Sequence, residues 1–285
     1  MKRQKSFDND RPTCYLVATP IGNLNEMTPR AIEILKQVDV IAAEDTRNTG
    51  KLLAHFSIET RMISHHEHNE TQSTNGILQL LEAGQNVALV SDAGYPLISD
   101  PGEILVKKIV DAGFNVVPIS GSSAVLNALI ASGLSPQPFL FYGFLPVNDK
   151  DCRAQLNQLK AYPYTLIFYE APHRIVKTLK KIHEVFGDRT ACLARELTKR
   201  HEEFLRGTLS ELIEASDELR GEIVLVVQGN KDEHVPDVDL SEINEMITSY
   251  ISNGVSASQA IRKVSEETGI SKNELYAHYH QKDQS

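Results

Sequence analysis

The chain has 285 residues, of which 41% are hydrophobic and 24% charged, and its formal net charge at pH 7 is −9. This length leaves room for about two domains, each with its own core. No apolar run approaches the roughly 18 residues of a transmembrane helix, and the polar segment 1–11 lacks the apolar stretch of a secretory signal. Composition therefore argues against a membrane or secreted protein. It predicts a cytoplasmic protein that begins with a disordered arm over residues 1–11.

The cysteines are three in number and far apart in the chain. Cys14 and Cys192 lie in strand-like runs, where a buried, reduced thiol is the expected state. Cys152 is the third, and none of the spacings is that of a metal-binding pair. We therefore expect neither a disulfide framework nor a bound metal.

Charge is unevenly distributed along the chain. Residues 207–250 hold two Lys or Arg and eleven Asp or Glu, a balance of −9, so the other segments sum to zero. Residues 171–206 hold nine Lys or Arg against five Asp or Glu, a balance of +4. Such a basic band suits a surface that faces RNA phosphates, and it equally suits an ordinary solvated helix face. Charge alone does not decide the partner.

Apolar runs of strand type alternate with helical patterns over most of the chain. The expected strands are 15–18, 38–43, 87–91, 116–118, 139–142, 165–169, 191–194 and 223–227. This alternation predicts an α/β architecture in which helices cover the sheets.

Several expected helices carry start and stop signals. Thr28 supplies an N-cap before Pro29, and Asp100 is expected to cap a helix in the same way, with Glu103 at the capping-box position. Three glycines are typical of helix ends: Gly84, Gly113 and Gly187.

Two polar segments, 133–138 and 229–239, interrupt the pattern and indicate domain boundaries. Beyond the second lie two capping boxes, Ser256 with Gln259 and Ser271 with Glu274. We expect a helix-turn-helix-like tail, or alternatively a helical clasp that packs on the protein itself or on a partner subunit. The predicted domains are an N-terminal α/β domain at 12–134, a C-terminal α/β domain at 138–230 and a helical tail at 240–285.

Two glycine- and proline-rich turns follow expected strands directly: ATPIGNL at 18–24 and SDAGYPLISDPG at 91–102. Polar turns at strand ends are where open α/β sheets bind ligands. Asp92 directly follows its strand, where it can accept hydrogen bonds from a ribose or an amine. Ordinary surface turns of the same composition are the alternative. No G-x-G-x-x-G opens a helix and no P-loop sequence occurs, which disfavours NAD and P-loop nucleotide sites.

The two turns belong to a longer ordered series. The segments are ATPIGNL, AEDTR (43–47), HNE (68–70), SDAGYP, GFLP (143–146), YEAPHR (169–174), ARELTK (194–199) and GEIVLVV (221–227). From about residue 14 to residue 228, this series resembles the bacterial ribosomal RNA small subunit methyltransferase I family of the tetrapyrrole-methylase-like superfamily. Two positions depart from the family pattern: Tyr95 stands where Thr is usual, and SGSSA (120–124) replaces the commoner PGPSA or PGPCA.

The resemblance implies a fold, a reaction and partners. The fold would be two α/β domains with a cofactor cleft between them, followed by the helical tail. The reaction would be S-adenosylmethionine-dependent 2′-O-methylation of a cytidine (nominally cytidine 1402) in the decoding region of 16S rRNA. The partners would be 16S rRNA or the small ribosomal subunit and a second copy of the chain in a homodimer, without metal or membrane.

Cofactor-side residues are expected from the turns, the SGSSA helix start and the strands of the second domain. They are Pro20, Gly22, Ser91, Asp92, Ala93, Gly94, Ile98, Ser122, Ser123, Tyr169, Ala194, Leu197 and Gly221. For Ser122 and Ser123, simple helix capping is the alternative.

Catalytic or substrate-side residues are expected mainly from the family segments. They are Glu44, Asp45, Asn69, Glu70, Glu170, Arg195 and Lys199. Arg and Lys suit RNA phosphates, whereas Glu or Lys suits removal of a proton from a ribose hydroxyl. Structural salt bridges, loop solvation and helix capping are the alternatives. The histidines of HHEHNE, at 65, 66 and 68, have no distal partners that would complete a metal site.

Two other functions stay open from the residues alone. One is methylation of a small molecule of the tetrapyrrole type, and the other is RNA binding by the tail without catalysis. The retained cofactor-type turns argue against the second, because a binding protein does not need them.

Overall fold

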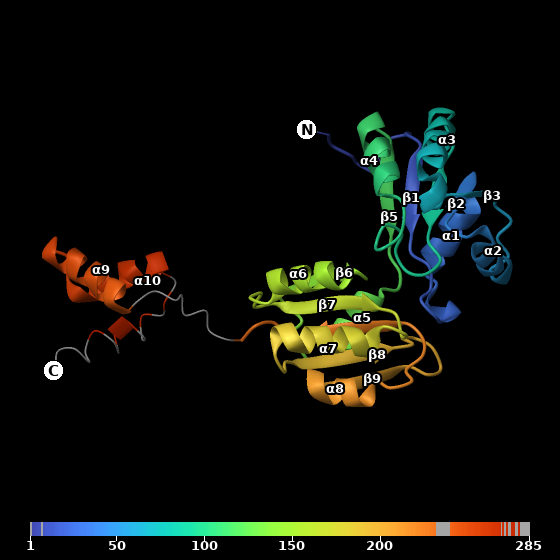
Figure 1. Ribbon diagram of the computed structural model, residues 1–285. Coiled ribbons are helices and arrows are strands. Elements are labelled where there is room, and N and C mark those ends of the chain that lie inside the picture. The colour runs from blue at the N-terminus through green and yellow to red at the C-terminus, as the bar shows by residue number, and fades with distance from the viewer. Residues whose placement is uncertain are drawn as a thin grey trace. The chain divides into compact units, whose positions relative to one another are not determined.

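The computed structural model describes residues 2–6, 8–231, 240–268, 270, 272, 275, 276 and 279. The chain divides into two compact units, residues 1–230 and 231–285 (Figure 1). The first unit contains both sheets, each with its own helices.

Within the described residues, the first sheet has five strands in the order β3-β2-β4-β1-β5, and all neighbours are parallel. The strands are β1 (Thr13–Val17), β2 (Val40–Ala43), β3 (Met62–Ser64), β4 (Val87–Val90) and β5 (Asn115–Ile119). The central runs VIAA and VALV are fully buried, as expected for strands covered on both faces. Because the strands are parallel, the loops after β1, β2 and β4 lie at one edge of the sheet.

Helices cover both faces of this sheet. One face packs against α1 (Pro29–Gln37) and α2 (Thr46–His55), and the other against α3 (Glu70–Glu82) and α4 (Glu103–Ala112) (Figure 1). The strands and these four helices form the first domain.

Predicted helix signals are confirmed at the start of α1 and at the end of α4. The Thr28 side chain accepts a hydrogen bond from the Ala31 N–H, and Gly113 is left-handed at the end of α4. The prediction that Asp100 caps α4 is wrong, because the cap is Gly102, with φ of 131° and no side-chain cap. The Gly102 N–H instead donates to the Glu70 carboxylate at 3.0 Å, and Asp100 lines a cavity.

The second sheet has five strands among the described residues, in the order β6-β7-β10-β8-β9. They are β6 (Phe139–Phe144), β7 (Thr165–Glu170), β8 (Thr190–Arg195), β9 (Glu203–Thr208) and β10 (Ile223–Val227). Only the β6–β7 pair is parallel among the pairs of this sheet; the others are antiparallel.

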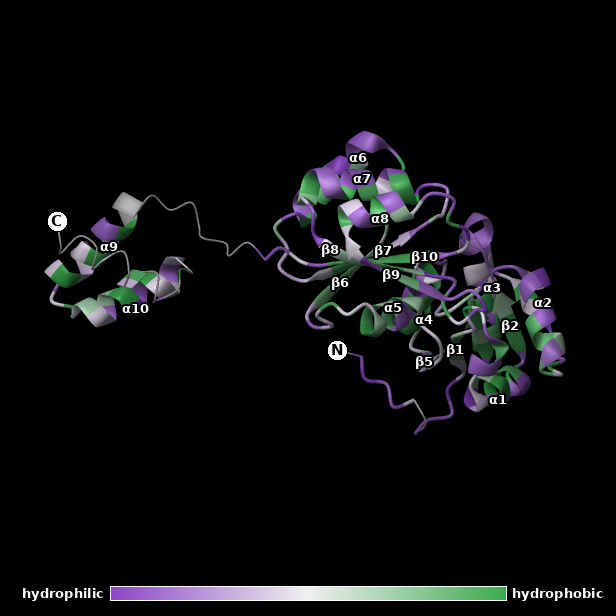
Figure 2. Ribbon diagram, turned by 90° about the horizontal axis from the view of Figure 1, so that it is seen from below, coloured by the Kyte–Doolittle hydropathy of each residue, from purple (hydrophilic) through white to green (hydrophobic). Residues whose placement is uncertain are grey.

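Helices also lie on both faces of the second sheet (Figure 2). One face packs against α6 (Asp149–Leu159), α7 (Ile175–Phe186) and α8 (Leu209–Ala215). The other face packs against α5 (Ala124–Ala131), whose Val125 and Leu129 join a core cluster with strand residues of β7, β8 and β10. This sheet with α5 to α8 forms the second domain. The polar segment 133–138 therefore follows a helix that already belongs to the second sheet.

Each predicted strand overlaps a strand of the structure, and the α/β fold class is confirmed. Two strands escaped prediction. β3 has only three residues, and β9 (EFLRGT) is an edge strand without a continuous apolar run. The three cysteines are free and buried.

The second unit contains α9 (Leu240–Ser252) and α10 (Ala257–Thr268). Its small core includes Ile247, Ile261 and Val264, together with Ile270 and Leu275. The predicted Ser256 signal coincides with the start of α10, where the Ser256 carbonyl accepts from the Ala260 N–H at 2.8 Å. The predicted box at Ser271 and Glu274 lies outside the described residues.

Candidate active site

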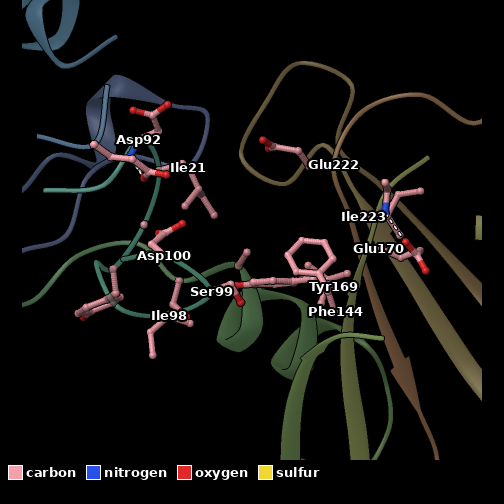
Figure 3. A pocket seen from close by; sticks show the side chains of 18 of the residues that line it. Ile21, Asp92, Ile98, Ser99, Asp100, Phe144, Tyr169, Glu170, Glu222 and Ile223 are labelled. Atoms are coloured by element: carbon pink, nitrogen blue, oxygen red, sulfur yellow. Dashed lines mark hydrogen bonds between the residues drawn. The ribbon is translucent and has the colours of Figure 1, made fainter. Parts of the chain in front are cut away.

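A cavity of about 450 Å³ lies between the two sheets of the first unit (Figure 3). Figure 3 shows Asp92, Asp100 and Ile98 on the side of the first sheet, across from Phe144, Tyr169 and Glu222. The complete lining is Ile21, Glu44, Asp92, Ala93, Gly94, Tyr95, Ile98, Ser99, Asp100, Ser123, Ala124, Phe144, Tyr169, Glu170, Ala171, Pro172, Glu222, Ile223 and Val224.

The two predicted turns meet at this cavity. Thr19 and Gly94 exchange backbone hydrogen bonds, with N···O distances of 2.9 and 3.0 Å. Gly94 has φ of 78°, a left-handed conformation that strains residues with a Cβ. The Tyr95 hydroxyl accepts from the Gly121 N–H at 3.1 Å, which ties the second turn to the SGSSA segment. The turns thus form one hydrogen-bonded platform.

The wall contributed by the first sheet is acidic. It carries the carboxyl groups of Glu44, Asp92 and Asp100. Burial, and then the nearby charges of Glu44 and Asp92, raises the pKa of Asp100 to about 6. Burial likewise raises the pKa of Glu44 above its usual value. Three carboxyl groups that repel one another favour a cationic ligand, because it would relieve that repulsion.

The opposite wall carries aromatic and apolar side chains, together with Glu170 and Glu222. The rings of Phe144 and Tyr169 lie 5.4 Å apart, and the Phe144 side chain is 54% exposed. Burial, followed by the charges of Asp100 and Glu222, raises the pKa of Tyr169 to about 12, so its phenol is neutral. On the first-sheet side of the cavity, Ile98 is 47% exposed and adds apolar surface. Together, these side chains suit a flat apolar group such as a base.

The loop that carries Ile98 has an unusual backbone. Leu97 and Ser99, on either side of Ile98, have φ of 72° and 68°. Such conformations cost roughly 1–3 kcal/mol each in residues other than glycine, and they cluster at ligand sites. The strained loop and the cavity therefore both indicate that this edge of the first sheet is the functional one.

Comparison with known families decides which class of protein has this architecture. A family model described as Tetrapyrrole (Corrin/Porphyrin) Methylases matches residues 13–213. A Bacillus subtilis (strain 168) protein named Ribosomal RNA small subunit methyltransferase I is 49% identical, covering 98% of this chain and 99% of its own length. A protein of the same name from Synechocystis sp. is 48% identical over 92% of this chain and 95% of its own length.

The chain belongs to the ribosomal RNA small subunit methyltransferase I family. That family lies within the tetrapyrrole methylases, so the family resemblance of the sequence is confirmed.

Solved structures share the fold at low identity. Uroporphyrin-III C-methyltransferase from Thermus thermophilus, in complex with S-adenyl homocysteine, has a TM-score of 0.56 and 18% identity, covering 76% of this chain and 97% of that one. The protein APE0931 from Aeropyrum pernix K1 has a TM-score of 0.63 and 17% identity, covering 77% of this chain and 85% of that one. At these identities the likeness establishes the fold.

The residues expected on the cofactor side divide into two groups. Those that line the cavity are Asp92, Ala93, Gly94, Ile98, Ser123 and Tyr169. The others lie elsewhere: Pro20, Gly22, Ser91, Ser122, Ala194, Leu197 and Gly221. Pro20 and Ser91 line a second, smaller cavity. Ala194 and Leu197 are buried beneath α5 in the core of the second domain.

Both serines of the SGSSA segment have structural partners. Ser123 is the N-cap of α5, and its hydroxyl accepts from the Leu126 N–H at 3.4 Å. The Ser122 hydroxyl donates to the Glu26 carboxylate at 2.7 Å. Helix capping thus occurs at Ser123, which also lines the cavity.

Two predicted glycines accommodate side chains of the ARELTK segment. A Cβ at Gly22 would lie 2.5 Å from the Lys199 Cγ, so glycine is needed where the two domains touch. Gly221 has φ of 89°, and a Cβ there would collide with the Glu196 carboxylate. Close packing against the second domain is what the structure shows at both positions.

Among the predicted catalytic residues, Glu44 and Glu170 reach the cavity. Glu170 is 3% exposed, and its carboxylate accepts from the Thr178 hydroxyl at 2.5 Å and the Ala171 N–H at 2.8 Å. The Arg174 Nε lies 3.4 Å away. These partners hold the Glu170 carboxylate in place at the start of the loop after β7.

The remaining acidic and amide residues hold the first domain together. Asp45 caps α2, accepting from the Arg47 N–H at 2.8 Å, and the Arg47 side chain lowers the pKa of Asp45 to about 2. The Asn69 amide oxygen accepts from the His66 N–H at 2.8 Å. Glu70 accepts from Gly102 at the end of the cavity loop. None of these three lines the cavity.

Both predicted cations of the second domain are paired. The Lys199 Nζ lies 2.9 Å from the Glu196 carboxylate and 3.0 Å from that of Glu222, which lines the cavity. Arg195 pairs with Glu203. Lys199 therefore packs beside Gly22 of the first domain and also pairs with Glu222 in the cavity wall.

Several lining residues were not predicted as site residues: Ile21, Tyr95, Ser99, Asp100, Ala124, Phe144, Ala171, Pro172, Glu222, Ile223 and Val224. Most stand inside segments already singled out, such as SDAGYPLISDPG, GFLP, YEAPHR and GEIVLVV. The sequence therefore predicted the segments that form the cavity. Which residues of each segment line it depends on the direction of the side chains.

Among the described residues, no group of three or more His, Cys, Asp or Glu side chains is arranged to hold a metal ion. His65 is fully buried, with its Nδ1 at 2.8 Å from the Ser73 hydroxyl, and burial lowers its pKa. Over the same part of the chain, no helix is both long and apolar enough to cross a bilayer.

Proposed function

We propose that this methyltransferase transfers a methyl group from S-adenosylmethionine to the ribose 2′-oxygen of a cytidine in the decoding region of 16S rRNA. The observation that carries the proposal is the cavity whose carboxyl-rich wall faces an aromatic wall. The names of the relatives support rRNA as the substrate. Family membership and the S-adenyl homocysteine complex of a protein of the same fold support the cofactor.

The residues present fit this cofactor. S-adenosylmethionine has a sulfonium, an ammonium group and an adenine, and when bound it supplies an electrophilic methyl group. Asp92, Asp100 and Glu44 would hold the cationic end, because their mutual repulsion falls when positive charge enters. Phe144 and Ile98 would contact the adenine, which needs an apolar slot.

The chain would promote the reaction mainly by positioning. Fixing the acceptor hydroxyl in line with the methyl group replaces a bimolecular encounter by an oriented one. The Asp100 carboxyl group, with its pKa raised to about 6, has a basicity close to that needed to accept a proton near neutral pH. Glu44 lies on the same wall and is a second candidate. The supporting contacts of Glu170 favour a positioning role for that residue.

RNA engagement is the proposed role of Arg195, Lys199 and the tail. The tail has Lys263 near the Tyr250 ring, at 5.0 Å from the centroid, and a core of its own. A chain that ends at Lys231 keeps the whole first unit. It should bind S-adenosylmethionine normally and lose much of its activity on ribosomal subunits. Loss of folding would favour the alternative of a structural clasp.

A homodimer in the cytoplasm completes the proposal. Exposed apolar side chains on and beside α5, including Leu126 at 50% and Ile130 at 75%, are consistent with a face that a second copy covers. Sedimentation of the full chain measures this directly, and a monomer at micromolar concentration would contradict it.

The test of the function is mass mapping of 16S rRNA from cells with and without this protein. We expect one methylated cytidine ribose to disappear with the protein and return when purified protein and S-adenosylmethionine are added to the isolated small subunits. Unchanged rRNA, together with methylation of a tetrapyrrole by the purified protein, would support the small-molecule alternative instead.

A further inference from the structure

A second cavity, of about 240 Å³, lies in the first domain next to the first one. It is lined by Thr19, Pro20, Leu24, Asn48, Thr49, Lys51, Leu52, Ser91 and Asp92. These residues follow β1 and β4 or lie on α2, so the cavity opens where parallel strands end. Asp92 lines both cavities and forms part of the boundary between them.

The lining has the chemistry of a nucleotide site. Lys51 is exposed and, within the described residues, makes no ion pair, unlike Lys199 and Arg195 on the other side of the cleft. An unpaired ammonium is suited to a phosphate. Leu24 and Leu52 provide apolar surface, and the Asn48 amide provides donors and an acceptor for a base edge or a ribose.

The connection between the cavities passes through Asp92. Its carboxylate accepts from the Asn48 amide at 3.0 Å, and its N–H faces the Glu44 carboxylate at 3.4 Å. A group that binds to Asn48 is thus linked through the Asn48–Asp92 hydrogen bond to the acidic wall of the first cavity. The second cavity, at about 240 Å³, is of a size that suits one nucleoside.

We propose that the second cavity binds the methyl-acceptor nucleotide of the RNA, with Lys51 on a phosphate and Asn48 on the base or ribose. This inference rests on the proposed function and assigns the acceptor to a specific site within it. It places RNA recognition on α2 of the first domain, in addition to the basic residues of the second.

The test compares Lys51→Ala with Lys36→Ala in the full chain. Lys36 is a matched control because it is an exposed lysine in the last turn of α1, makes no ion pair with any described residue and lines neither cavity. The substrate is small ribosomal subunits from cells that lack this protein. The readouts are the KM for subunits, its dependence on salt, and the dissociation constant of S-adenosylmethionine.

For Lys51→Ala we expect the KM for subunits to rise about tenfold and the slope of log KM against log salt to fall by about one, as for loss of one phosphate contact. The affinity for S-adenosylmethionine should stay within twofold, and Lys36→Ala should change none of these values. A second variant, Leu24→Trp, fills the cavity from a side chain that is 41% exposed. It should reduce transfer more than tenfold without altering cofactor affinity.

Unchanged KM and salt slope in Lys51→Ala, together with full activity of Leu24→Trp, would overturn the assignment. Failure of the wild type to methylate the subunits at all would instead refute the proposed function. The two failures are therefore distinguishable.

Discussion

The two domains contribute opposite kinds of polar chemistry to the cleft. On the first domain, Asp92 and Asp100 face the cavity, and Lys51 has no ion-pair partner among the described residues. On the second, Glu170 and Lys199 are occupied by protein partners. Unpaired charge costs stability and is available to ligands, whereas paired charge fixes shape. We infer that the first domain carries the chemistry that binds the charged end of the cofactor and that the second holds the wall against which the ligand packs.

The largest expected effect is that of Asp92→Ala. Removal of a carboxylate from both cavities should weaken S-adenosylmethionine about ten- to hundredfold, the usual cost of losing a charged hydrogen bond, and should reduce methyl transfer at least as much. Because Asp92 is exposed, the free energy of unfolding should change by less than about 0.5 kcal/mol. Calorimetric titration and urea unfolding measure the two quantities. Loss of stability without loss of affinity would show that Asp92 has a structural role and does not bind the ligand.

Glu170→Ala should behave in the opposite way. The Thr178 hydroxyl and the Ala171 N–H would lose their acceptor, at a cost of about 1–3 kcal/mol in the free energy of unfolding. Glu170→Gln keeps an oxygen acceptor and should cost less. Urea unfolding of the three proteins checks this order. An unchanged stability with abolished transfer would identify Glu170 as a catalytic carboxylate.

Asp100→Asn tests how much the acidic wall of the cavity lowers the free energy of unfolding. The pKa of Asp100 is about 6 in the folded protein, above the usual value of 3.8. The contribution of Asp100 to the free energy of unfolding is therefore fully present below pH 3.8 and is lost as the pH rises through 6. Asp100 is only partly buried, so we expect Asp100→Asn to stabilise the protein by about 1 kcal/mol at pH 7 after allowance for solvent screening. Cofactor affinity of the wild type should rise between pH 5 and pH 7, and the variant should lack this rise. Equal pH profiles would show that Asp100 does not contact the ligand.

The smallest effect is expected for Lys199→Met. Methionine keeps the apolar stem beside Gly22 and removes the ion pairs with Glu196 and Glu222. Partly exposed pairs contribute about 1 kcal/mol or less, so transfer to subunits should fall only a few-fold, with cofactor affinity within a few-fold of wild type. Steady-state kinetics and calorimetry measure both. Abolished cofactor binding in a folded variant would place Lys199 on the cofactor side.

The sequence predicted the strands that build the cleft and the two turns that meet at it. Those turns could be found because buried parallel strands are continuous apolar runs that end in glycine and proline. The direction of single side chains could not be found in the same way. Asp100 stood in a good capping-box pattern, yet Gly102 is the N-cap of α4, and its N–H donates to Glu70, which is distant in sequence.

Tertiary packing also determines the surroundings of several other predicted site residues. The sequence predicts Gly22 and Gly221 on the cofactor side, and in the structure side chains of the ARELTK segment lie against both. Ala194 and Leu197 are also predicted on the cofactor side, and in the structure both are buried in a cluster that includes residues of α5. In each instance the decisive neighbour comes from a distant part of the chain, which local patterns do not reveal.

The central claim is tested most directly by calorimetric titration of the full chain with S-adenosylmethionine, NAD and ATP. We predict binding of one S-adenosylmethionine per chain with a dissociation constant in the low micromolar range or below, and no binding of NAD or ATP. Binding of NAD or ATP without any binding of S-adenosylmethionine would contradict the assignment of the cavity.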